Sequence, residues 1–159
     1  MKLHNDNLIF SPSDLILFLE SPFASWMEHF SLISPEALDF KDQDDAMMLM
    51  LQDKGAEHES SVLEGLKRQG LTIEDIGLSS DKKAATIQAM KEGADVVFQA
   101  CLSQDQFTGF ADFLVKVPGS SQLGDYHYEI WDTKLSKSLQ PYYTIQLCCY
   151  QEMIAAIQG

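Results

Sequence analysis

Hydrophobic and polar residues follow a period near two along the second half of the chain, between residues 95 and 134. Residues 95–102 form a nearly continuous apolar run, which is typical of a central strand buried on both faces. Two further apolar runs, residues 107–117 and 126–134, flank the polar, glycine-containing segment 118–125. They predict a β-hairpin with a longer loop, and the three runs together predict a three-stranded meander.

Elsewhere the apolar positions recur every three or four residues, the period of amphipathic helices. Ser11 and Pro12 mark one helix start, because serine caps a helix and proline suits the first helical position. Such caps and breakers predict five helices, over residues 11–20, 22–30, 44–69, 80–93 and 141–157. The order of elements indicates one α/β domain over residues 1–159, a mixed sheet flanked by helices.

Each strand of the predicted hairpin carries an acidic residue among apolar neighbours. Asp112 lies in the first strand, and Asp132 and Lys134 lie two residues apart in the second. Residues two apart on a strand point to the same face. Carboxylates on adjacent strands can share a hard divalent cation, while a nearby ammonium neutralises an anionic substrate or positions a water molecule.

These residues resemble the hallmark of the PD-(D/E)XK phosphodiesterase superfamily, in which an acid on one strand is followed by acid-x-Lys on the next. Two flanking motifs narrow the resemblance to the RecB-like nucleases. Gly55-x-x-His58 lies upstream and Gln146-x-x-x-Tyr150 lies downstream, in the order of the His motif and the Gln/Tyr motif of that group. The resemblance spans roughly residues 11–150, which is most of the chain.

The resemblance implies a restriction-endonuclease-like core and a metal-dependent nuclease that hydrolyses phosphodiester bonds, with DNA as the expected substrate, in repair or recombination. A further strand usually joins that core and is expected beyond Gly159. The implied catalytic residues are Asp112, Asp132 and Lys134. The implied ligands of Mg²⁺ or Mn²⁺ are His58, Asp112, Asp132 and the carbonyl of Thr133, and the implied substrate-binding residues are Gln146 and Tyr150.

Several of the residues singled out here also have a simpler, purely structural interpretation. A histidine in the middle of a helix, such as His58, is often solvated or hydrogen-bonded rather than a ligand. Gln146 and Tyr150 lie one helical turn apart and could instead anchor the last helix to the sheet. Tyr142 and Tyr143 suit core packing as well as base stacking. The lysines on the outer side of the predicted fourth helix suit a solvated face as well as phosphate contacts: Lys82, Lys83 and Lys91.

Composition bounds the class of protein. A chain of 159 residues with 45% apolar content is large enough for one domain with its own core. No apolar run approaches ~18 residues and no signal peptide is visible, so no membrane partner is expected. Three cysteines, two of them adjacent, fit a reducing compartment, and we expect the cytoplasm. Relatives with an iron–sulfur cluster have a cysteine where this chain has Ser21, so no cluster is expected.

Charge opposes the nuclease interpretation. The chain has 24 acidic and 11 basic residues, a net charge of -13, whereas nucleic-acid surfaces are normally basic. Bound cations would reverse the local sign, and another domain would supply basic surface. Because the chain stops directly after an apolar helical run, we expect it to be the N-terminal fragment of a longer protein, with a helicase domain as one possible neighbour in the same chain.

Two alternatives from other classes therefore remain. One is a catalytically inactive nuclease-fold module that binds nucleic acid or protein. The other is a plain protein-interaction domain whose Asp and Lys residues match the motifs by coincidence. Only the enzyme requires His58, Asp112, Asp132 and Lys134 to converge in one place.

Overall fold

The computed structural model describes residues 1–40 and 46–159, and it is an α/β structure with a mixed sheet between helices. The four strands of this sheet lie in the order β3-β4-β5-β6, with β3 parallel to β4 and the others antiparallel. A separate antiparallel hairpin of β1 and β2 lies at the N-terminus. The strands are β1 (Lys2–His4), β2 (Asn7–Ile9), β3 (Ile73–Asp75), β4 (Val96–Gln104), β5 (Phe107–Ser121) and β6 (Gly124–Trp131).

Five α-helices are found where caps and periodicity predict them: α1 (Pro12–Glu20), α2 (Pro22–Ile33), α3 (Ala46–Arg68), α4 (Lys82–Glu92) and α5 (Pro141–Gln158). The Ser21 hydroxyl accepts the backbone N–H of Ala24 at 3.1 Å and so caps α2. Asp81 caps α4 in the same way. The predicted start of the long helix at residue 44 lies outside the described residues. Of the helices described here, none has the length and apolar character needed to cross a bilayer.

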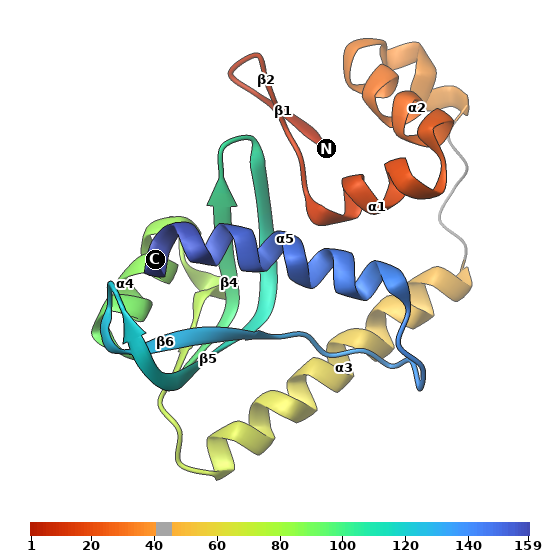
Figure 1. The fold of residues 1–159 in the computed structure, drawn as a ribbon. Helices are drawn as coiled ribbons and strands as arrows, with labels where there is room; N and C mark the ends of the chain where they lie inside the picture. The colour runs from red at the N-terminus through yellow and green to blue at the C-terminus, as the bar shows by residue number, and fades with distance from the viewer. Residues whose placement is uncertain (41–45) are drawn as a thin grey trace.

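The sheet separates two layers of helices (Figure 1). Helix α5 crosses one face, and α3 runs diagonally behind the other. The larger core cluster joins the sheet to α4 and α5 through buried residues such as Met90, Leu102, Tyr128 and Ile154. The smaller cluster packs Leu63 and Leu66 of α3 against Val96 and Phe113. Burial of these side chains stabilises each interface by roughly 1.5–3 kcal/mol per large apolar residue.

Three details of the meander differ from the prediction. Strand β6 ends at Trp131, so Asp132 and Lys134 follow the strand instead of lying on it. The expected long loop is short, because β5 continues through Pro118 and Gly119 with an irregular register and turns at residues 122–123. The sheet also contains a strand that the sequence does not predict, β3, which precedes the meander and is only three residues long. Its mixed polarity follows from its position at the edge of the sheet.

Gly109 provides a test of this packing. A Cβ atom at residue 109 would lie 2.7 Å from Cε1 of Tyr150 and 3.0 Å from Cδ of Pro12. We expect Gly109→Ala to lower the free energy of unfolding by about 1–3 kcal/mol, the usual range for overpacking, as measured by urea denaturation. The matched control is Gly65→Ala in α3, where the added methyl group meets no atom within 4 Å and should stabilise the helix by about 0.5–1 kcal/mol. Equal effects of the two substitutions would contradict the contact.

Candidate active site

A break in strand alternation marks the centre of the candidate site. Along β4, Val97 belongs to the core under α5, Phe98 packs against the core on α3, and Ala100 belongs again to the first. Strict alternation would place Ala100 with Phe98. Strand β5 shows the same break, because Phe113 packs on the α3 side while Leu114 and Ala111 both belong to the core under α5. Gln99 and Asp112 lie at the two breaks, opposite one another, between the paired positions Phe98↔Phe113 and Ala100↔Ala111.

The backbone of Gln99 explains the break. Its φ angle is +54°, a left-handed conformation that residues other than glycine seldom adopt. Such a conformation costs on the order of 1–3 kcal/mol and is found preferentially at functional sites. The Gln99 amide group donates a hydrogen bond of 2.8 Å to Glu59 on α3. The strained residue therefore faces α3 and ties that helix to the middle of the sheet.

Asp112 and Asp132 lie side by side, as the sequence predicts. Phe113 pairs with Trp131 at the end of β6, so the next position along the chain places Asp132 opposite Asp112. Asp112 holds the segment after β6 in place. Its Oδ2 accepts the backbone N–H of Thr133 at 2.8 Å and the Thr133 hydroxyl at 3.2 Å. The Thr133 contact seen here therefore uses its N–H and hydroxyl groups, while the prediction concerned its carbonyl.

Lys134 contacts one of the two acids, Asp132. The Lys134 ammonium lies 2.9 Å from Oδ1 and 2.7 Å from Oδ2 of Asp132. The Asp132 side chain is only 4% exposed. Burial therefore raises the pKa of Asp132, the Lys134 ammonium opposes this shift, and the neighbouring Asp112 carboxyl group adds to it. The end of β6 thus brings together the buried carboxylate of Asp132, the carboxylate of Asp112 and the ammonium of Lys134.

Helix α3 contributes Glu59 to this point. Burial raises the pKa of Glu59, and the charges of Asp112 and Asp132 raise it further, while Lys134 and the Gln99 amide lower it. Glu59 therefore lies within electrostatic range of all three charged groups. Adjacent helical residues point about 100° apart, so when Glu59 faces the acids its neighbour His58 does not. Glu59 is thus the residue of α3 that the structure brings to the acids, and the role of His58 as a metal ligand stays a prediction.

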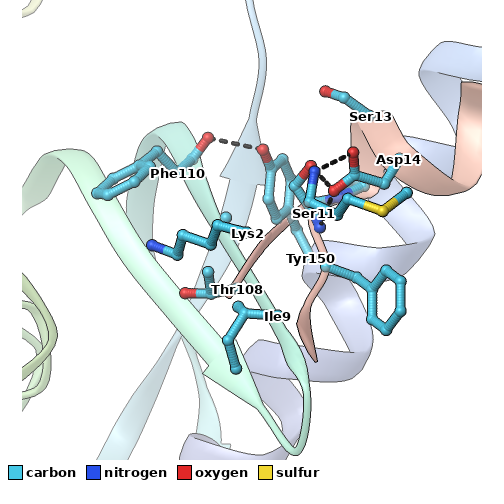
Figure 2. A pocket seen from close by; sticks show the side chains of 12 residues that line it. Lys2, Ile9, Ser11, Ser13, Asp14, Thr108, Phe110 and Tyr150 are labelled. Atoms are coloured by element: carbon cyan, nitrogen blue, oxygen red, sulfur yellow. Dashed lines mark hydrogen bonds and ion pairs between the residues drawn. The ribbon is translucent and has the colours of Figure 1, made fainter. Parts of the chain in front are cut away.

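The predicted pair on α5 is adjacent to the acids. The Gln146 amide donates to the Tyr150 hydroxyl at 3.4 Å. This hydroxyl donates to the carbonyl of Phe110 at 2.7 Å (Figure 2). Burial raises the pKa of Tyr150, and the charges of Asp132 and Asp112 contribute to the rise. The pair therefore anchors α5 to β5, as the structural interpretation predicts, and also lies near the acids, as the functional one requires.

The sequence suggests only a supporting role behind the ligands for Glu59 and plain packing for Gln99, whereas the structure joins the two by a hydrogen bond beside the acids. A polar residue in the middle of the apolar run at 95–102 is the signal for Gln99, because a buried amide requires a partner. The signal for Glu59 is weaker. Whether Glu59 faces the sheet depends on the rotation of α3 about its axis. Its neighbours, such as His58, are also polar, so the sequence alone does not show which of them faces the sheet.

Comparison with known proteins leaves the activity open. No protein-family model matches the chain, and neither a curated protein nor a solved structure was found to be similar. What the protein does must therefore be inferred from these side chains and their arrangement.

Proposed function

We propose that the protein is a metal-dependent nuclease of the PD-(D/E)XK type that hydrolyses phosphodiester bonds. The observation that carries the proposal is the buried Asp132, opposite Asp112 and in contact with Lys134, at the end of β6. A structural ion pair needs one carboxylate and one ammonium. Here Asp112 and Asp132 lie together with Glu59 within electrostatic range, against one ammonium, and such an excess of partly buried negative charge is typical of sites that bind cations and anionic substrates.

The donor atoms fit Mg²⁺ or Mn²⁺. Among residues 1–40 and 46–159, no three His, Cys, Asp or Glu side chains are close enough to hold one ion. Mg²⁺ is commonly held by only one or two carboxylates and keeps several water molecules. Asp112 and Asp132 would serve as those two ligands, the Thr133 carbonyl as a backbone ligand, and Glu59 would reach the ion through water. Bound there, the ion would supply an activated water molecule and stabilise charge on the phosphate.

The protein's own groups take the remaining tasks. Lys134 orients the attacking water or neutralises charge that develops on the phosphate. Glu59, whose pKa is raised, accepts a proton from that water and is held in position by Gln99. Gln146 and Tyr150 contact the nucleic-acid backbone next to the acids. DNA is the proposed substrate, in repair or recombination, and a helicase the proposed neighbour. The cysteines are all free, so we place the protein in the cytoplasm.

The second candidate is an inactive nuclease fold that serves as a binding module. The net charge of -13 favours it, since the chain has few cations for phosphates. Incubation with labelled single- and double-stranded DNA and RNA, with Mn²⁺ and at low salt, separates the two candidates. We expect metal-dependent cleavage of DNA. Absence of cleavage of any of these substrates would favour the binding module.

Metal binding is a separate prediction. Calorimetric titration of the protein with Mn²⁺ should show binding that Asp112→Ala abolishes. Glu59→Gln should weaken it by a factor on the order of 10–100, the usual cost of losing a group that supports the ligands. The matched control is Asp125→Ala, which removes an exposed acid at the start of β6 and should leave the affinity unchanged. Equal losses in Asp125→Ala and Asp112→Ala would place the ions elsewhere.

A further inference from the structure

A cavity of about 350 Å³ lies between the N-terminal hairpin, the start of α1 and the first half of β5. Figure 2 shows the Lys2 amine and the Thr108 hydroxyl extending to the same side as the Phe110 ring. Phe110 is 43% exposed, although it follows the buried Gly109. An exposed aromatic ring at the mouth of a cavity is available for stacking.

One lysine lies over this ring, and a second lines the same cavity. The Lys82 ammonium, at the start of α4, lies 5.3 Å from the centroid of the Phe110 ring. Lys2 reaches the cavity from β1. The chain has only 11 basic residues against 24 acidic ones, so a lysine over the exposed ring and another in the same cavity are a local exception. An aromatic ring flanked by ammonium groups complements a ligand with an aromatic base and a phosphate.

The acid in the cavity does not cancel this character. Asp14 accepts hydrogen bonds from the N–H and hydroxyl of Ser11, both at 2.7 Å, and pairs with the N-terminal ammonium of Met1. Its charge is therefore compensated within the protein. The lysines at the other side of the cavity stay available for an anionic ligand.

Tyr150 connects the cavity to the candidate active site. It lines the cavity, donates its hydroxyl to the Phe110 carbonyl, and lies within the electrostatic field of Asp112 and Asp132. Phe110 itself precedes Asp112 by two positions on β5. A polymer whose phosphate lay at the acids would therefore bring an adjoining unit to this ring.

We propose that Phe110, with Lys82 and Lys2, binds one nucleotide of a single strand, with the base stacked on the ring and the phosphate beside the ammonium groups. The proposal rests on the proposed function, because it places the neighbouring phosphate of the same strand at Asp112 and Asp132. It adds a single-stranded segment as the form of substrate that reaches the site, since a paired base has no free face for stacking.

The test is equilibrium binding of a fluorescent oligothymidylate, measured by anisotropy with EDTA and at low salt, so that the result does not depend on cleavage. Phe110→Ala should weaken binding about tenfold, the usual effect of losing one stacked base. Phe110→Tyr should restore it. Lys82→Gln should weaken binding severalfold and reduce its salt dependence. The ring of Phe110 carries no hydrogen bond and its carbonyl is retained, so Phe110→Ala should keep the fold, which circular dichroism checks.

Two matched controls sharpen the test. Phe23→Ala removes a phenylalanine on α2 that is 71% exposed, and Lys83→Gln removes the exposed lysine beside Lys82. Both should leave affinity unchanged. Equal affinities of Phe110→Ala, Lys82→Gln, the two controls and the parent, or no binding by the parent, would overturn the proposal. So would displacement of the strand by thymidine monophosphate at equal concentration, which would indicate a site for free nucleotides. Cleavage, scored separately with Mn²⁺, decides the proposed function whatever this binding shows.

Discussion

Replacing Asp132 with asparagine should lower the rate of metal-dependent cleavage by a factor on the order of 10³, because the loss of a metal ligand removes several kcal/mol of stabilisation from the transition state. The same substitution should not weaken the metal-free fold. Asparagine has the shape of aspartate, and its oxygen still accepts a hydrogen bond from Lys134. Initial rates with Mn²⁺ and melting temperatures in EDTA measure the two effects.

The pKa of Asp132 gives the sign of the stability change. Burial raises this pKa in the folded protein, so the folded state binds the proton more tightly than the unfolded state does. The ionised form therefore destabilises the fold above the folded pKa, and this cost disappears as the pH falls below the unfolded value. Asp132→Asn removes the cost, so its melting temperature should equal or exceed that of the parent near neutral pH, with a difference that shrinks on acidification.

The control for this prediction is Asp125→Asn, an exposed acid at the start of β6. It should alter neither the cleavage rate nor the melting temperature. A large loss of stability in Asp132→Asn would show that this carboxylate holds the fold together through Lys134. Its role as a ligand would then lose its support.

Much of the fold follows from the sequence because its signals are local. Caps and breakers fix helix starts, and α2 and α4 begin at the predicted places, after Ser21 and Asp81. The meander follows from three apolar runs. Strand β3 was not predicted, because three residues, Ile73–Asp75, carry too little periodicity and their pairing with β4 depends on distant contacts. The continuation of β5 past Pro118 depends on a register shift between β5 and β6, and no local sequence pattern predicts this shift.

The candidate site was predictable only in part, for a geometric reason. Asp112 lies on β5 and Asp132 directly follows β6, so the pairing of Phe113 with Trp131 places the two acids opposite one another. The direction in which the Glu59 side chain points depends on the rotation of α3 about its axis. This rotation follows from the packing of Leu63 and Leu66 against the sheet. The position of the Gln99 side chain depends on a left-handed backbone conformation, which residues other than glycine seldom adopt. Such a conformation is maintained by tertiary contacts, which a single sequence does not display.

The acidic charge of the chain and the geometry of the site both indicate that a cation must bind before an anionic substrate can approach the acids. Glu59, Asp112 and Asp132 bring three negative charges to the single ammonium of Lys134. A divalent cation would balance the excess of two charges that remains when all three are ionised. An approaching phosphate would otherwise meet net repulsion. In this protein, cation binding should therefore precede substrate binding at the acids, while the ring of Phe110 holds the strand without metal.

Replacing Lys134 with alanine should have the largest effect on stability and rate together. It leaves the Asp132 side chain, which is 4% exposed, without its counter-ion. Breaking such a pair commonly costs about 3–5 kcal/mol when both partners are buried. Lys134 is 31% exposed, so we expect a smaller loss, about 1–3 kcal/mol, in EDTA. Mn²⁺ should restore part of the stability, because a cation beside Asp132 replaces the lost charge. Denaturant unfolding with and without metal measures this.

The cleavage rate separates a catalytic role of Lys134 from a structural one. With Mn²⁺ present and the fold restored, Lys134→Ala should still cleave slower by a factor on the order of 10² or more, because no ammonium then orients the water or faces the phosphate. Lys134→Arg keeps the charge and should keep the stability, yet its broad planar group is placed differently and the rate should stay low. Lys137→Ala, an exposed lysine on the same loop, should match the parent in both measurements. If Lys134→Ala cleaves at the parental rate once Mn²⁺ restores its stability, Lys134 serves the fold alone and the proposed mechanism is wrong.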